Sequence, residues 1–379
     1  MHGLFFKLFF SIIIAAYGLS CEAAISSPIV PVASRTKSVT YNIDKNAVSG
    51  DFSIWKDVSG GQGSSNPPSS DDSNYYSRMS WLCQSESNEA VGACASAPLY
   101  SSAQVTNFIT LQFVEQRTQI KRNIRLTGES VVFSVRGRYS SLTMNSSWGG
   151  TGAVGSSELI FKTLNVWIPS SEIKRLPIGG VWTAKLVLTQ SSWLPTAPVA
   201  TWTANITLNL LDSGNIQIYL PEYNTANPTI DLGLKSNGTE LHGRVDVQAC
   251  LYDGFNAQSE KYSITMSDPN SKDNNFYIKN LSRSANSDLK NSIPYEVWIS
   301  NLTTSSDTSI KMQNNKDHIF SNIRQLTPRL TTLPKIPNPV YCTPWQFSLR
   351  ANRLVQKEQA IGKYNGTLRI KFTPSTSNF

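Results

Sequence analysis

Residues 203–221 read TANITLNLLDSGNIQIYLP, two runs of alternating apolar and polar residues joined by the short polar stretch LDSG. Alternation with a period of two places successive side chains on opposite faces of a strand, so both runs predict β-strands. The pattern alone permits two structures, a β-hairpin within one domain or a joint between two domains. The choice between them decides how the rest of the chain is organised.

The same alternation recurs along the chain, with apolar residues at every second position in 109–113, 164–168, 182–188, 295–299 and 368–372. No amphipathic stripe long enough for a substantial helix accompanies it. One buried and one solvated face per strand is typical of antiparallel sheets, and we predict an all-β fold built from β-sandwiches. Each side of LDSG has enough strands for its own core, which favours a joint between two domains.

The N-terminus has the pattern of a secretory signal peptide. A basic residue, Lys7, precedes an apolar stretch from Leu8 to Ala16, and small residues follow it. We place the cleavage after Ala23, so that residues 1–23 are removed and the mature chain is exported as a soluble protein. A lipoprotein signal ending at Cys21 is the weaker alternative.

Export changes how the cysteines are interpreted. Four remain after residue 23, and an even number in an oxidising compartment predicts disulfides with three possible connectivities. A division of the chain near LDSG would favour Cys83–Cys94 and Cys250–Cys342. Zinc is a poor alternative because the chain has no CxxC or HxxxH spacing, and we predict no metal site.

The motifs of common enzymes and cofactor-binding proteins are absent from the sequence. It contains no GxSxG, HExxH, P-loop or dinucleotide fingerprint, and we expect neither enzymatic activity nor a cofactor. The formal net charge of +8 is not concentrated in a basic run, so a nucleic-acid partner is not expected. A pair of carboxylates for glycoside hydrolysis remains an open alternative, because their separation is a spatial property.

Seven segments together point to one family of proteins. In chain order they are YSRMSWLC (76–83), GAC (92–94), ITLQFVEQRTQIKR (109–122), IPSSEIKRLPIGGVW (168–182), NITLNLLDSGNIQIYLP (205–221), CLYDGF (250–255) and GTLRIKFTPS (366–375). With these segments, the chain resembles the tip adhesins of class 5 fimbriae. These are minor pilins of the colonisation factor antigen I type, also grouped as CblD-like pilus biogenesis initiators. The resemblance extends from about residue 75 to the C-terminus.

The resemblance implies two immunoglobulin-like domains in tandem. An adhesin domain over 24–210 would be followed by a pilin domain over 214–379, and LDSG would supply the interdomain linker. The linker residues are Leu211, Asp212 and Ser213. A linker this short, with strands on both sides, predicts a nearly fixed, elongated arrangement.

The resemblance also implies that the pilin domain lacks one strand. The N-terminal extension of the next pilin subunit would fill the gap, by main-chain hydrogen bonds and alternate side chains. Leu368, Ile370 and Phe372 are candidates for the wall of this donor-strand groove. The implied partners are the major pilin subunit, a periplasmic chaperone that covers the open edge, and an outer-membrane usher.

The receptor site implied by the resemblance includes Arg78, in the motif before the first cysteine of the pair. Where relatives carry two adjacent arginines, this chain has Ser192 and Trp193, so a different ligand specificity is expected. The implied function is a tip adhesin that is secreted through the periplasm, binds host cell-surface glycoconjugates and initiates pilus assembly. An assembly initiator without receptor binding and a secreted β-sandwich glycosidase are the alternatives.

Overall fold

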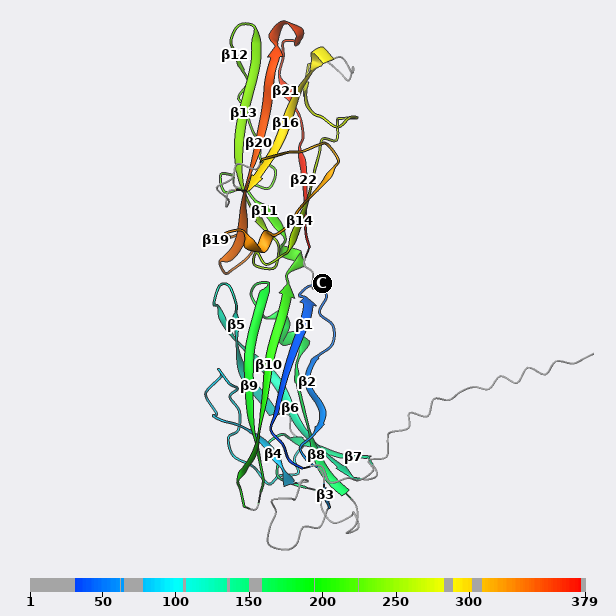
Figure 1. The fold of residues 1–379 in the computed structure, drawn as a ribbon, viewed down its shortest axis with the longest axis vertical. Coiled ribbons are helices and arrows are strands. Elements are labelled where there is room, and N and C mark those ends of the chain that lie inside the picture. The colour runs from blue at the N-terminus through cyan, green and yellow to red at the C-terminus, as the bar shows by residue number, and fades with distance from the viewer. Residues whose placement is uncertain are drawn as a thin grey trace, which may run out of the picture.

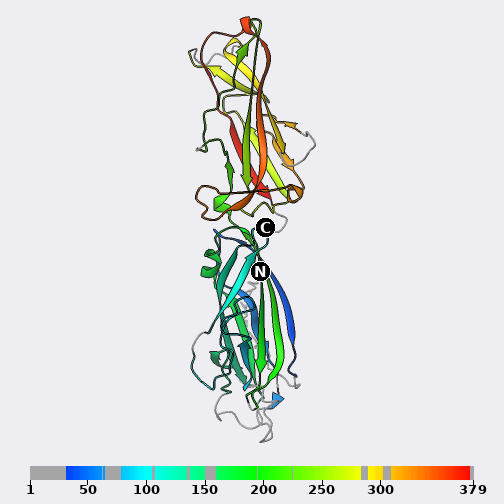
Figure 2. The ribbon, with the colours of Figure 1, turned by 90° about the vertical axis from the view of Figure 1, so that its left-hand side faces the viewer.

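The computed structural model shows two β-domains stacked end to end in an elongated molecule (Figures 1 and 2). It describes residues 31–61, 63–64, 78–104, 107–134, 137–149, 159–193, 195–223, 225–282, 289–301 and 309–375. The predicted signal peptide, residues 1–23, lies outside the described residues. Within those ranges no helix is long and apolar enough to cross a membrane.

Among the described residues, the first domain has ten strands joined in one sheet that folds over to enclose a core, and one short helix, α1 (Ser170–Lys174). The path of the sheet is β1-β10-β9-β5-β6-β8-β2, and β3, β4 and β7 pair beside it. The strands are β1 (Arg35–Asp44), β2 (Phe52–Ser59), β3 (Gly63–Ser64), β4 (Ser80–Cys83), β5 (Asn107–Glu115), β6 (Lys121–Ser134), β7 (Gly137–Thr143), β8 (Leu159–Ile168), β9 (Gly180–Ser191) and β10 (Pro198–Leu211).

Strand β10 shows how the alternation of the sequence produces this core. Its even-numbered residues from Trp202 to Leu210 point inward, and each is at most 1% exposed. The Trp202 ring packs edge-to-face against Trp55 and Trp81, at 5.7 and 5.4 Å between centroids. Its indole Nε1 donates to Oε1 of buried Gln190 at 3.0 Å, so the polar atom of the ring is also satisfied.

The strand beside β10 was not foreseen from the sequence. β1 pairs with β10 in parallel over its whole length, from Arg35↔Trp202 to Asp44↔Leu211. Both edges of β10 are therefore hydrogen-bonded, to β1 on one side and to antiparallel β9 on the other. The N-terminal segment of the described chain closes the first domain.

The second domain has two sheets packed around a separate core. The larger follows β11-β13-β20-β16-β15-β21, with β12, β17 and β19 beside it, and the smaller is β18-β14-β22. The strands are β11 (Gln217–Tyr219), β12 (Lys235–Ser236), β13 (Glu240–Tyr252), β14 (Lys261–Ser267), β15 (Phe276–Asn280), β16 (Ser292–Asn301), β17 (Ile310–Lys311), β18 (Asp317–Phe320), β19 (Arg329–Thr331), β20 (Val340–Val355), β21 (Tyr364–Asn365) and β22 (Arg369–Ser375). Short 3-10 turns are η3 (Ser213–Asn215), η4 (Leu289–Asn291), η5 (Ile323–Gln325) and η6 (Gln356–Glu358).

The stretch LDSG does not form a hairpin turn. β10 pairs with β1 and β9, whereas β11 pairs with β13 of the other sheet. Between them the chain turns through η3, and the backbone N–H of buried Asp212 donates to the carbonyl oxygen of Gly254 at 2.8 Å. The Asp212 carboxylate lies 3.8 Å from the Lys45 ammonium. These contacts hold the connecting segment to both domains.

A buried carboxylate also bridges the two domains. Glu115, at the end of β5, is fully buried and accepts hydrogen bonds from its own turn, including the backbone N–H of Arg117. It also accepts from Asn256 Nδ2 at 2.7 Å and Gln258 Nε2 at 3.2 Å in the second domain. The side-chain Oδ1 of Asn256 in turn accepts from the backbone N–H of Tyr341 at 2.7 Å. A buried charge needs such partners, so the domains interlock through polar contacts as well as the chain itself.

Both disulfides favoured by the division of the chain are present. Cys83–Cys94 lies in the first domain with a sequence separation of 11, and Cys250–Cys342 lies in the second with a separation of 92. The second bridge connects β13 to β20, two neighbouring strands of the larger sheet. The all-β fold and both cysteine pairs are thus confirmed.

Candidate functional site at the free end of the first domain

Two of the expected receptor residues, Arg78 and Trp193, lie at the end of the first domain that faces away from the second. Strand β4 pairs with β9 through Ser80↔Ser191. Arg78 precedes this pair by two residues and Trp193 follows it by two, so both lie just beyond the paired ends of the same two strands. The end of the hairpin formed by β9 and β10 is at the bottom of Figure 1, far from the second domain.

Trp193 forms an aromatic pair that the sequence did not predict. Its ring lies 5.7 Å from that of Tyr100 with an interplanar angle of 33°. Tyr100 is 48% exposed and Trp193 is half-buried, so both rings are accessible to solvent. Exposed aromatic faces with polar rims can stack on the C–H faces of a sugar ring, and the pair is suited to such contact.

Ser192 has a different position from the one expected. It is 2% exposed, and its hydroxyl donates to the carbonyl oxygens of Pro195 at 2.7 Å and Ala197 at 3.3 Å. The hydroxyl therefore holds the turn between β9 and β10 and is not available to a ligand. With its hydroxyl engaged in this turn, Ser192 is not placed for direct contact with a receptor, and its role at the site stays a prediction.

The interior near this end is unusually polar for a sandwich core. Lys162 on β8 occupies an inward-facing position in line with Leu164, is fully buried, and donates from Nζ to the carbonyl oxygen of Ser146. Burial lowers the pKa of the Lys162 ammonium well below its usual 10.5. No feature of the sequence indicated this burial, because a lysine in a strand is ordinarily expected to face solvent.

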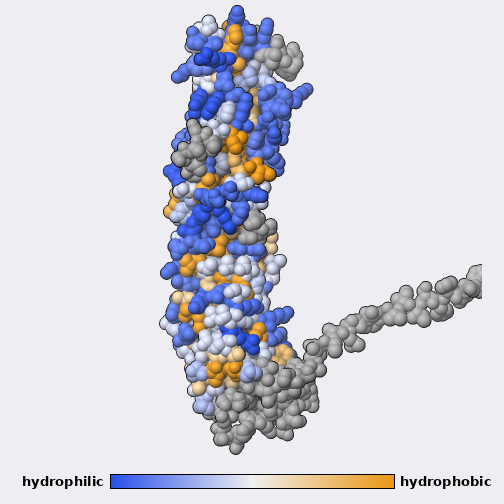
Figure 3. All heavy atoms as spheres, viewed as in Figure 1, coloured by the Kyte–Doolittle hydropathy of each residue, from blue (hydrophilic) through white to orange (hydrophobic). Residues whose placement is uncertain are grey.

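The last strand of the second domain differs from a finished core strand. β22 pairs with β14 on one side and is an edge of its sheet on the other. Its inward residues Ile370 and Phe372, and Leu368 just before it, contact the core but remain half-buried. In the view of Figure 3, hydrophobic atoms gather on the second domain where Figure 1 places β22.

The same core has half-buried apolar residues on the edge of the other sheet. Ile218 and Leu220 lie in and just after β11, and Ile230 and Leu234 follow in the segment that leads to β12. β11 is a terminal strand of the larger sheet. Edge strands of both sheets thus contribute incompletely covered side chains to this core, and an edge strand can pair with an added strand.

Family models match both halves of the chain. The model for the first domain of the E subunit of CFA/I fimbriae matches residues 20–213, and the model for its second domain matches residues 216–376. The CFA/I fimbrial E subunit of Escherichia coli is 36% identical over 307 residues, which cover 79% of this chain and 81% of that protein.

Solved structures resemble both domains and cover most of the chain. The crystal structure of CfaE, described as the adhesive subunit of CFA/I fimbria of enterotoxigenic Escherichia coli, has a TM-score of 0.73 and 29% sequence identity over 92% of this chain and 94% of that chain. A structure described as a chaperone–tip adhesin complex vital for activation of CFA/I fimbriae biogenesis has a TM-score of 0.62 at 29% identity, over 92% of this chain and 97% of that chain.

Proposed function

Since the chain belongs to the CfaE family of CFA/I fimbrial proteins, we propose that it is the adhesive tip subunit of a fimbria and attaches a bacterial cell to host cell-surface glycoconjugates. This is a family of fimbrial adhesins and not of enzymes. The first domain acts as the adhesin and the second as the pilin. We place the joint between them at Leu211, Asp212 and Ser213.

The proposal for receptor binding rests on one observation, the placement of Arg78 and the Tyr100–Trp193 pair at the free end of the adhesin domain. This end is opposite the second domain, from which a fibre would extend (Figure 2). An arginine and two aromatic rings at one end of the domain offer planar donors and a stacking surface to a sugar. Trp193 and Tyr100 contact the sugar face, and Arg78 contacts its polar groups.

The proposal for assembly rests on the exposed edge of β22 and the half-buried side chains Leu368, Ile370 and Phe372. An unpaired strand edge above incompletely covered apolar residues is what an added strand occupies in β-augmentation. The major pilin subunit supplies this strand from its N-terminal segment. Before assembly a periplasmic chaperone covers the edge, and an outer-membrane usher receives the complex.

The predicted signal peptide gives the route to the surface. Residues 1–23 direct export to the periplasm, where the two disulfides form. The mature protein is then placed at the fimbrial tip on the cell surface. Its adhesin domain points outward because the pilin domain is linked to the next pilin.

The test is attachment of fimbriated cells carrying Trp193→Ala or Arg78→Ala to host epithelial cells. Loss of a desolvated aromatic contact costs about 1–3 kcal/mol, so attachment falls about five-fold or more while fimbriae stay normal in number and length. Phe108→Ala is the control, since Phe108 is a 49% exposed ring of the same domain that lies under the Arg125 guanidinium and is not part of the Tyr100–Trp193 pair. Normal attachment of both variants would instead identify an assembly initiator without receptor binding at this site.

A further inference from the structure

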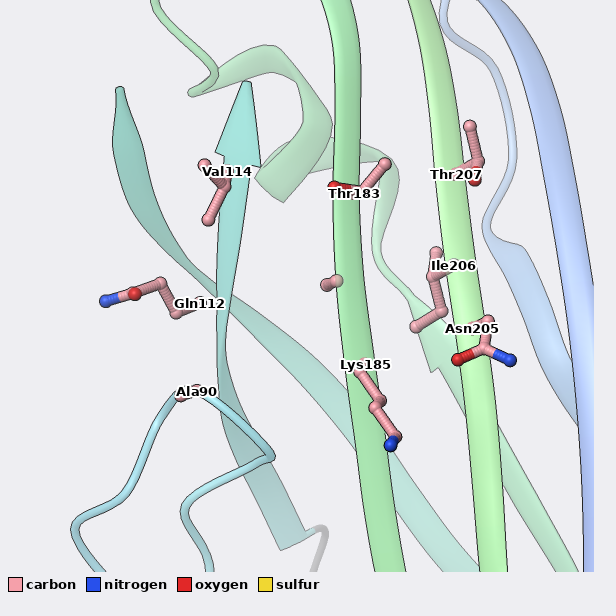
Figure 4. Close-up of a pocket in the computed structure, with 9 residues that line it drawn as sticks. Ala90, Gln112, Val114, Thr183, Lys185, Asn205, Ile206 and Thr207 are labelled. Atoms are coloured by element: carbon pink, nitrogen blue, oxygen red, sulfur yellow. The ribbon is translucent and has the colours of Figure 1, made fainter. Parts of the chain in front are cut away.

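The outer face of the adhesin domain is hollowed where β5 and β9 separate. These strands pair only at Val114↔Thr183 and Glu115↔Trp182, and toward the free end β9 pairs with β4 instead. The hollow has a volume of about 420 Å³ and lies beside β10 on the flank of the domain (Figure 4). It is separate from the Tyr100–Trp193 pair, which does not line it.

The walls of this hollow are fixed by the loop that the Cys83–Cys94 disulfide closes. The backbone N–H of Gln112 on β5 donates to the Glu89 carbonyl oxygen at 2.7 Å, and that of Val187 on β9 donates to the Val91 carbonyl oxygen at 2.9 Å. The loop therefore bridges the two strands that have separated. A hollow held in this way loses little conformational freedom when a ligand enters it.

The polar side chains of the hollow have no bonding partner in the part of the chain that the structure describes. Lys185 and Asn205 are directly opposite each other on β9 and β10, and Thr183 is opposite Thr207. In the described part of the chain, the side chains of Gln112, Lys185 and Asn205 form no hydrogen bond or ion pair. Figure 4 shows the Lys185 ammonium and the Asn205 carboxamide on the same side of the hollow, whereas the Gln112 carboxamide on β5 is directed away from them.

The charge that lines the hollow is positive. Lys185 is exposed and is the charged residue of the lining, and no carboxylate of the described residues lines the hollow. Glu89, next to the lining residue Ala90, has no ion pair with Lys185 among the described residues. An uncompensated ammonium attracts an anion, while the amides and hydroxyls around it offer both donors and acceptors.

We propose that this hollow binds one acidic sugar residue of the host glycan. The sugar carboxylate contacts the Lys185 ammonium, its hydroxyl and amide groups bond with Asn205 and Thr183, and its apolar face lies toward Val114. A polyhydroxylated monoanion uses the mixed donors and acceptors and the single cation together. The inference rests on the proposed function in that the ligand is a host glycan, and it adds a charged subsite on the flank of the domain.

The test is ligand-observed saturation-transfer NMR on the full mature protein with 3′-sialyllactose, and with lactose as the matched neutral probe. An exposed ion pair gives weak binding, so we expect a Kd near the millimolar range for 3′-sialyllactose and a markedly weaker signal for lactose. Lys185→Gln weakens binding of the acidic probe about five-fold or more. Raising the salt concentration from about 50 to about 300 mM also weakens binding of the acidic probe to the unmodified protein, because the charges are exposed to solvent and are screened.

Lys37→Gln is the control, since Lys37 is exposed on β1 of the same domain and outside the hollow. Unchanged melting temperatures show that both variants fold. Equal binding by Lys185→Gln, or equal binding of lactose and 3′-sialyllactose, overturns the subsite. If Lys185→Gln binds normally while Arg78→Ala does not, the subsite fails and the proposed function stands. If binding depends on Lys185 while attachment is unaffected by Arg78→Ala and Trp193→Ala, the subsite stands and the proposed receptor site fails.

Discussion

The last strands of the two domains have the same sequence pattern and different surroundings. On β10 the inward residues are fully buried, because β1 and β9 pair with its two edges. On β22 the inward residues Ile370 and Phe372 stay half-buried, and one edge has no neighbour among the described residues. Alternation predicts which side chains face inward, but the neighbouring strand decides whether they are covered. The first domain includes its closing strand, and we propose that the second receives one from another subunit.

Among the changes that test this comparison, removal of a disulfide is expected to have the largest effect on stability. Removing Cys250–Cys342 by the double change to Ala releases a loop with a separation of 92 residues, and the chain-entropy model gives a loss of about 4.5 kcal/mol. The same change at Cys83–Cys94, with a separation of 11, costs about 3 kcal/mol. Denaturant unfolding of each variant measures the difference. Equal losses would mean that the second domain does not depend more on its bridge than the first.

The next largest effect comes from truncating one inward side chain on β10 and one on β22. Trp202→Ala removes a fully buried ring and its hydrogen bond to Gln190, and costs about 3–5 kcal/mol in the first domain. Phe372→Ala costs about half as much, because the ring is only half-buried, although it packs edge-to-face on Tyr262 at 4.8 Å. The cost of Phe372→Ala rises toward that of Trp202→Ala when a donor peptide is bound. The same full cost with and without the peptide would show that β22 is already covered.

A change at Glu115 would break the connection between the two domains while leaving each core intact. Glu115→Ala removes the acceptor of Asn256 and Gln258 and leaves their buried amides unpaired, at a cost of about 2–3 kcal/mol. Calorimetry should show the two unfolding transitions moving apart in temperature. Lys121→Ala, an exposed change on the neighbouring strand β6, is the control. Transitions that stay together in Glu115→Ala would place the coupling elsewhere in the interface.

The smallest expected effect is a loss of stability of the second domain at acidic pH. Burial, with a smaller contribution from the positive charge of Lys316, lowers the pKa of His318 below its usual 6.5, and Asp317 acts in the opposite direction. The unfolded chain then binds a proton more readily than the folded one, so the second domain loses a little stability as the pH falls below 6.5. His318→Gln should reduce the difference in melting temperature between pH 7 and pH 5. If the difference in melting temperature between pH 7 and pH 5 is unchanged in His318→Gln, the pH dependence comes from other groups.

The sequence predicted which segments form strands better than it predicted the neighbours of each strand. The alternation of Trp202–Leu210 and the four cysteines correctly indicated a sandwich and its disulfides. The parallel strand β1 was missed because RTKSVTYNID has mostly polar residues at its exposed positions and no strong apolar run. Glu115 and Lys162 were missed as well, since a charged residue in a strand carries no mark of burial. Their partners, Asn256 and Ser146, lie 141 and 16 residues away along the chain, and neither pairing is marked in the sequence.

The receptor end was predictable in part. The residues before Cys83 and after β9 could be aligned by resemblance, and the pairing Ser80↔Ser191 brings Arg78 and Trp193 to the same end. Tyr100 could not be found in this way, because its contact with Trp193 depends on how the loop after Cys94 folds back. The burial of Ser192 likewise depends on the turn it supports, which alternation does not describe.

Amide hydrogen exchange of the mature protein tests the central claim most directly. The comparison is between Arg369–Ser375 in β22 and Pro198–Leu211 in β10, without and with a peptide from the N-terminal segment of the major pilin. We predict rapid exchange in β22 that slows on adding the peptide, while β10 is protected throughout. Protection of β22 equal to that of β10 in the absence of peptide would show that the second domain needs no further strand.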